Sequence, residues 1–186
     1  MSELIPRLPF EQLPPAIAAA LESKYRRLGY LGEFFAATAH QPAALKAFID
    51  FTDLAKGELD LRWVELIALT VATMKSVAYE KNQHERLALK LGYGREWVAA
   101  VERLAPECEP LLDAVERTIQ RFVIAAVDRD GLGTGPLLDT VVVALGAERA
   151  VAVLFVMGRY TTHAIVVNSL DIQAPVPSIF EDGFNG

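Results

Sequence analysis

Apolar residues recur along most of the chain at the spacing of one face of an α-helix, and no segment shows the strict alternation of a half-buried strand. Glycine, proline and short polar stretches separate these periodic segments and mark the expected helix ends. The sequence therefore predicts an all-α, single-domain helical bundle of about eight or nine helices over residues 1–186. The expected helices cover residues 14–27, 32–40, 42–56, 61–75, 78–91, 95–104, 110–127, 137–145 and 148–170.

The two ends of the chain lack this periodicity. Residues 1–13 contain prolines and are expected to form an extended N-terminal arm. Residues 171–186 are rich first in proline and then in glycine and asparagine. This composition predicts a C-terminal tail that wraps over a neighbouring subunit or is mobile.

Two consecutive predicted helices in the middle of the chain carry ionisable residues in apolar surroundings. The first is apolar on nearly every side but contains Glu65. In the second, Glu80, His84, Leu87 and Leu91 fall at i, i+4, i+7 and i+11, which is one stripe of a helix. The leucines predict that this stripe faces the core. Buried ionisable groups must be paired or functional, because desolvating them alone is costly.

Each of these residues also has a plain structural interpretation. Glu65 would then be a partly exposed carboxylate in the first turn of its helix, where the helix dipole favours it. Glu80 and His84 would form an exposed ion pair worth about 0.3–0.5 kcal/mol. Tyr79, one position off the stripe, would be a boundary aromatic residue with its hydroxyl in water.

The spacing between Glu65 and His84, with Y-E-x-x-x-H at its end, resembles the carboxymuconolactone decarboxylase and alkylhydroperoxidase D superfamily. The alkylhydroperoxidase branch has a Glu, then a C-x-Tyr-C pair, then a His four residues after the second Cys. When the two patterns are aligned on Glu65 and His84, the cysteine positions hold Val77 and Glu80, and the tyrosine position holds Tyr79. The resemblance continues in G-x-L-x-x-R-x-x-E before this motif and G-R-Y after it. The chain thus resembles the branch that lacks the cysteine pair.

The resemblance implies an alkylhydroperoxidase D-like helical fold and a carboxymuconolactone decarboxylase-like lyase that uses acid/base chemistry on a small lactone or carboxylate. In that case His84 is the general acid/base, Glu80 orients it or takes its proton, and Glu65 and Tyr79 complete a relay. Two alternatives stay open: a divergent alkylhydroperoxidase or peroxiredoxin-family member without dithiol activity, and a non-catalytic oligomer that binds a small ligand. The candidate cations for an anionic substrate are Arg62, Arg86 and Arg159.

Composition excludes several other functions. Hydrophobic residues make up 52% of the chain without an apolar run long enough for a membrane span, which indicates a homo-oligomer rather than a membrane protein. From the resemblance we expect a trimer or hexamer, although a dimer is possible. The net charge of −6 argues against a nucleic-acid-binding surface. The first ten residues lack the long apolar core of a signal peptide, so we expect a cytoplasmic protein.

The remaining reactive residues do not form a recognisable site. Three scattered histidines and one cysteine, Cys108, offer no metal motif and no internal disulfide, so neither a metal nor a cofactor is expected. His163 is interpreted as a satisfied core or interface histidine. His40 precedes Gln41-Pro42 and is interpreted as the end of a helix.

Overall fold

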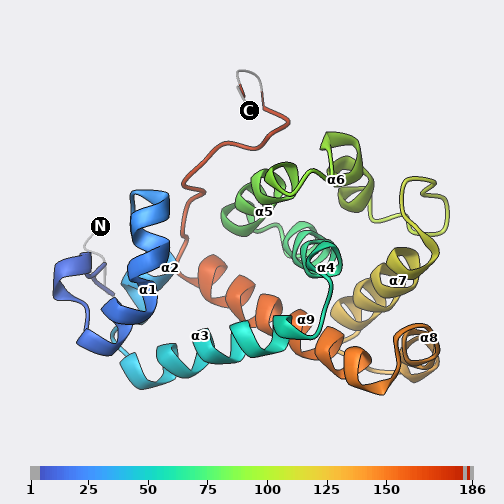
Figure 1. Cartoon of the computed structure of the whole chain (residues 1–186), viewed down its shortest axis with the longest axis horizontal. Coiled ribbons are helices and arrows are strands. Elements are labelled where there is room, and N and C mark those ends of the chain that lie inside the picture. Colours follow the sequence, from blue (N-terminus) through green and yellow to red (C-terminus); the bar gives the residue numbers. More distant parts are fainter. Residues whose placement is uncertain (1–4, 182–183, 185–186) are drawn as a thin grey trace. The chain divides into compact units, whose positions relative to one another are not determined.

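The computed structural model describes residues 5–181 and 184, and all regular elements in this part are helical. In these described residues a short 3-10 helix, η1, is followed by nine α-helices, in agreement with the eight or nine that the periodicity predicted (Figure 1). The elements are η1 (Phe10–Gln12), α1 (Pro15–Leu28), α2 (Glu33–Thr38), α3 (Pro42–Gly57), α4 (Leu61–Met74), α5 (Ala78–Lys90), α6 (Arg95–Glu102), α7 (Ala114–Asp128), α8 (Gly135–Leu145) and α9 (Ala147–Ser169).

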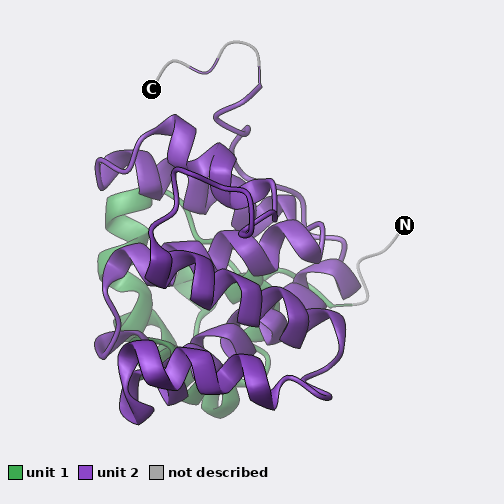
Figure 2. Ribbon diagram, turned by 90° about the vertical axis from the view of Figure 1, so that its right-hand side faces the viewer, with its two compact units in different colours: residues 1–54 green, residues 55–186 purple. Residues whose placement is uncertain are grey.

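The chain divides into two compact units, residues 1–54 and 55–186 (Figure 2). The first unit packs Ile17 and Leu21 of α1 and Phe34 of α2 into its interior. Its leading segment is held by a backbone hydrogen bond of 3.1 Å from Leu8 N to Ala36 O. The predicted arm therefore contains η1 and contacts α2, while residues 1–4 lie outside the described part. The assignment of residues 1–186 to one domain stays a prediction.

The second unit is built around α4, which packs against α5, α6, α7 and α9 (Figure 1). Every residue from Val64 to Ala72 is buried, which explains why this helix is apolar on all sides. Asp60 begins the helix by accepting a hydrogen bond of 2.8 Å from Arg62 N. The burial of α4 on all sides places Glu65 inside the unit.

Helix α7 begins later than the sequence predicted. Asp113 and Glu116 form a capping box, in which each side chain accepts a hydrogen bond of 2.8 Å from the other residue's backbone N–H. The helix therefore starts at Ala114 rather than near residue 110. The D-x-x-E signature of this cap is present in the sequence.

Helix α5 does not bury the face that its leucines predicted. Leu87 and Leu91 are 37% and 36% exposed, so the prediction that they face the core is wrong. The helix instead buries a largely polar face, because the C-terminal tail covers that face and supplies hydrogen-bond partners. The buried residues are Tyr79, Glu80, Asn82, Glu85 and Ala88.

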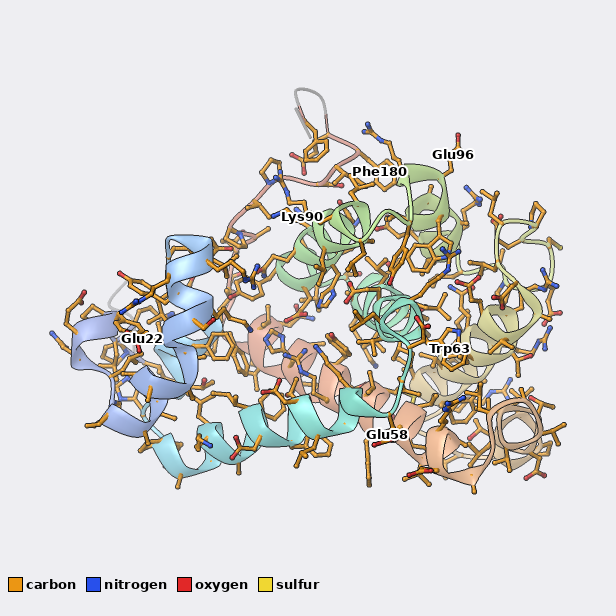
Figure 3. All side chains as sticks on the ribbon, in the orientation of Figure 1. Glu22, Glu58, Trp63, Lys90, Glu96 and Phe180 are labelled. Carbon is orange, nitrogen blue, oxygen red and sulfur yellow. The ribbon has the colours of Figure 1, made fainter. Side chains whose placement is uncertain are left out.

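The tail packs against α5 of its own chain, contrary to the prediction that it is mobile or covers a neighbour. Glu85 Oε2 accepts hydrogen bonds of 2.7 Å from both Ser178 Oγ and Ile179 N, and Ile179 is buried in the core. Arg86 donates to the Pro177 carbonyl. Phe180, labelled in Figure 3, lies 5.2 Å from the Arg95 guanidinium. Residues 182–183 and 185–186 lie outside the described part.

A second carboxyl group lies close to this anchor. Lys81 Nζ is 3.5 Å from Glu85 Oε1 and 3.5 Å from Glu102 Oε2, so one ammonium group faces two carboxyl groups. Burial and the neighbouring Glu85 raise the pKa of Glu102 to about 7, although Lys81 opposes the increase. Glu102 therefore holds a proton in mildly acidic solution.

Helix α9 is long and apolar enough to cross a membrane by length and composition alone. Half of its most apolar stretch is buried within the protein, and its buried residues include Arg159 and His163. Helix α9 is therefore partly buried in the second unit and carries two ionisable side chains on its buried side.

Candidate functional site

Three helices of the second unit bring ionisable side chains together. Glu65 comes from α4, Glu80 and His84 come from α5, and His163 comes from α9. Helix α4 packs against both α5 and α9, which places all four side chains in one buried cluster. The predicted proximity of Glu65 and His84 is confirmed, because His84 Nδ1 lies 2.6 Å from Glu65 Oε2.

His84 is held between two carboxyl groups. Its Nδ1 lies beside Glu65, and its Nε2 lies 3.0 Å from Glu80 Oε2. Burial lowers the pKa of His84, but the two carboxylates outweigh burial and raise the pKa to about 9. His84 is therefore an imidazolium at neutral pH, with both N–H groups directed at carboxylates.

Glu80 joins the two histidines. Its Oε1 lies 3.0 Å from His163 Nδ1, while its Oε2 faces His84 and lies 3.7 Å from an Arg159 nitrogen. Burial raises the pKa of Glu80, but His163, Arg159 and His84 together hold it well below the usual value. Glu80 is therefore ionised at neutral pH despite its burial.

His163 belongs to this cluster, and it is a buried core histidine with a carboxylate partner, as the sequence indicated. Its side chain is 2% exposed, and burial lowers its pKa although Glu80 acts in the opposite direction. At neutral pH the cluster thus combines one charged imidazole, His84, with one neutral imidazole, His163. Both share the Glu80 carboxylate, so a proton on either imidazole has an acceptor within hydrogen-bond distance.

Tyr79 is buried, and its ring packs against the ring of His163. The two ring centroids are 6.0 Å apart and the planes differ by 26°. The tyrosine therefore forms part of the wall of the cluster. Its predicted function in a proton relay stays a prediction.

Of the three candidate cations, only Arg159 lies at the cluster. Arg62 donates to Glu116 in a bond of 2.6 Å, and Arg86 donates to the Pro177 carbonyl. Arg159 is buried beside Glu80. It adjoins a buried stripe of α9 at helical spacing, formed by Val156, Tyr160, His163 and Val167.

Tyr160 was not among the predicted site residues, yet it packs directly against His84. The two rings meet edge to face, with centroids 5.2 Å apart. Burial raises the pKa of Tyr160 well above its usual value, and the carboxylates of Glu80 and Glu65 act in the same direction against Arg159. The phenol therefore keeps its proton at neutral pH.

The cluster is not arranged as a metal centre. No group of three or more His, Cys, Asp or Glu side chains in the described part has the arrangement needed to hold a metal ion. The two imidazoles and two carboxylates instead pair with one another across a chain of four groups, which suits proton transfer.

Comparison with known proteins finds a family match for the central part of the chain. Residues 42–107 match the model of the carboxymuconolactone decarboxylase family, and this range includes Glu65, Tyr79, Glu80 and His84. The fold matches that of a protein of unknown function from Agrobacterium tumefaciens that has been proposed to be an antioxidant defence protein, AhpD. The TM-score is 0.68 at 19% identity, over 75% of this chain and 96% of that one. Residues 42–107 thus match the carboxymuconolactone decarboxylase family, and the chain has an AhpD-like fold.

Other proteins of known structure have the same fold at low identity. A peroxidase-related protein with an alkylhydroperoxidase AhpD core, from Ralstonia eutropha, matches with a TM-score of 0.77 at 15% identity over 91% of this chain and 92% of that one. The debrominase Bmp8, in a cysteine-to-alanine variant bound to 2,3,4-tribromopyrrole, matches with a TM-score of 0.80 at 15% identity over 95% and 94%. No functionally curated protein matches this sequence.

Proposed function

We propose that this carboxymuconolactone decarboxylase-like protein is an acid/base enzyme that decarboxylates a small lactone carrying a carboxylate, or processes a similar carboxylate. The observation that carries the proposal is the His84 imidazolium held between Glu65 and Glu80, with a second imidazole on the other oxygen of Glu80. Such a reaction requires a proton donor held beside the substrate and a means of protonating that donor again.

The proposed reaction can be balanced with the groups in the cluster and water. The bond from carbon to the substrate's carboxylate breaks, carbon dioxide leaves, and the electron pair moves into the lactone carbonyl as an enolate. His84 then gives a proton to the carbon that lost the carboxylate, and a proton taken up from water restores the His84 imidazolium, with Glu80 as the carboxylate that stabilises it. Arg159, 3.7 Å from Glu80, keeps this carboxylate ionised and supplies positive charge for an anionic substrate.

The alternative of a divergent alkylhydroperoxidase or peroxiredoxin-family member would lack dithiol activity, because the chain has a single cysteine. The chain contains one cysteine, and this residue, Cys108, is exposed in the segment between α6 and α7. The peroxide-reducing chemistry of a cysteine pair needs a second thiol to form the disulfide. A non-catalytic ligand-binding oligomer remains the second candidate, and a substrate assay separates it from the enzyme.

We also propose that the protein is a cytoplasmic homo-oligomer, with a trimer or hexamer favoured. Large apolar side chains are exposed on α8 and α9, where Val143 is 88% exposed, Phe155 51% and Val151 46%. Burying such side chains against another subunit would remove apolar surface from water. This observation supports association and does not fix the number of subunits.

The direct test is carbon dioxide release from carboxymuconolactone and a series of smaller lactones and carboxylates. We expect His84→Gln to lower kcat by about 100-fold or more, because a positioned acid/base group contributes at least that much. His40→Gln is the matched control, since His40 bonds a backbone carbonyl outside the cluster. Circular dichroism should show the same helix content for both variants. Normal turnover by His84→Gln would refute the proposed role.

A further inference from the structure

Tyr160 is fixed in place beside His84 by several neighbours. The Arg159 guanidinium lies 4.3 Å from the centre of the tyrosine ring, and the Lys56 ammonium lies 5.3 Å from it. The edge-to-face contact with His84 fixes a third side of the ring. Because these contacts hold the ring, the direction of its hydroxyl group is also fixed.

The hydroxyl group of Tyr160 is completely buried, yet it makes no hydrogen bond to any residue in the described part of the chain. Leaving a buried donor unpaired costs about 1–3 kcal/mol, so phenylalanine would be the more stable choice for packing alone. A buried polar group that nothing in the described part of the chain satisfies is free to take a partner from outside the chain, such as a ligand or a water molecule. The Tyr160 hydroxyl group is therefore available to donate a hydrogen bond to a bound molecule.

The charges around Tyr160 indicate which chemical group would fit. At neutral pH three cationic side chains and two carboxylates surround the ring, which leaves one positive charge in excess. The high pKa of the phenol keeps the hydroxyl protonated, so it can donate to an anionic oxygen. The cations are Lys56, Arg159 and His84, and the carboxylates are Glu65 and Glu80.

We propose that the Tyr160 hydroxyl donates a hydrogen bond to a carboxylate oxygen of the ligand bound beside His84, with Lys56 as the accompanying cation. This inference rests on the proposed function and names the side chains that would bind the carboxylate of its substrate. Tyr160 is then a substrate-binding residue that the sequence motif around Glu80 does not include.

The test compares Tyr160→Phe, which removes only the hydroxyl, with the wild type by isothermal titration calorimetry. The probes are carboxymuconolactone, succinate and the uncharged γ-butyrolactone. We expect Tyr160→Phe to bind the two carboxylate probes about tenfold more weakly or worse, as for loss of a hydrogen bond to a charged group, and to bind γ-butyrolactone as the wild type does. Lys56→Gln should weaken the carboxylate probes in the same selective way. Tyr93→Phe, a tyrosine outside the cluster, is the matched control and should bind like the wild type.

Urea unfolding of the unliganded proteins separates a binding role from a structural one. Tyr160→Phe should be as stable as the wild type or more stable, because the hydroxyl has no partner to lose. A clear loss of stability would overturn the proposal by showing that the hydroxyl is satisfied in the free protein. Equal binding of the carboxylates by both proteins, or no carboxylate binding by the wild type, would overturn it as well. If the wild type binds carboxylates selectively through Tyr160 but releases no carbon dioxide, the proposed reaction fails while this inference stands.

Discussion

The charge on His84 should make the stability of the protein depend on pH in a defined range. The pKa of this imidazole is raised from 6.5 to about 9 in the folded protein. The folded state therefore binds the proton more tightly than the unfolded state. The resulting stability is fully present below pH 6.5 and is lost as the pH rises through 9.

The magnitude follows from the two pKa values. Each tenfold difference in proton affinity is worth about 1.4 kcal/mol, so the increase corresponds to about 3 kcal/mol of the free energy of unfolding. Side-chain exposure of 11% for His84 and 3% for Glu65 leaves little solvent to screen their interaction. This is a large share of the 5–15 kcal/mol that is typical for the whole folding free energy.

The perturbation is His84→Gln, studied by urea unfolding from pH 6 to pH 10. Other titrating groups are common to both proteins, so the difference between them isolates His84. We expect the stability advantage of the wild type over the variant to shrink by about 3 kcal/mol across this range. An NMR titration of the histidine ring should show His84 protonated until about pH 9.

Two results would refute this reasoning. A stability difference that stays constant with pH would mean that folding does not change the proton affinity of His84. A difference that grows with pH would mean that burial outweighs the two carboxylates and that the ring is neutral. His40→Gln, at a histidine outside the cluster, should show no comparable trend and serves as the control.

Three further predictions concern Glu80, Cys108 and Glu102. Glu80→Gln should lower kcat by about 100-fold or more and lower the pKa of His84, because it removes the carboxylate shared by both imidazoles; an unchanged pH–rate profile would contradict this. The protein should not reduce peroxides with a dithiol donor, and turnover that disappears in Cys108→Ser would show that this expectation is wrong. Stability should fall as the pH rises from about 4.5 to 7, because the folded state holds the proton on Glu102 more tightly; Glu102→Gln should remove this fall in urea-unfolding measurements.

The parts of the site that follow from local sequence could be predicted. Glu65 and His84 lie on consecutive helices joined by a short turn, so their spacing along the chain largely determines their spacing in the fold. The helix pattern also predicted nine segments close to those observed, with the later start of α7 as the main difference.

The parts that depend on distant segments could not be predicted. Arg159 and His163 approach Glu80 only because α9 packs against α4, and hydropathy alone describes α9 as an apolar core helix. The predicted orientation of α5 was wrong for the same reason. Leu87 and Leu91 marked an apolar stripe, but the tail, about 90 residues later, covers the polar side of the helix instead.

The anchoring of the tail has a consequence for the order of events during synthesis. Glu85 lies on α5, but its two hydrogen-bond donors, Ser178 and Ile179, are made 93 and 94 residues later. Until they leave the ribosome, the Glu85 carboxylate lacks two of the hydrogen bonds that it has when buried, which favours keeping this side of the helix in water. The nascent chain can therefore form α4 and α5 early, but it can close their shared core only after Ile179 emerges. During that interval we expect the chain to be most exposed to chaperones and proteases.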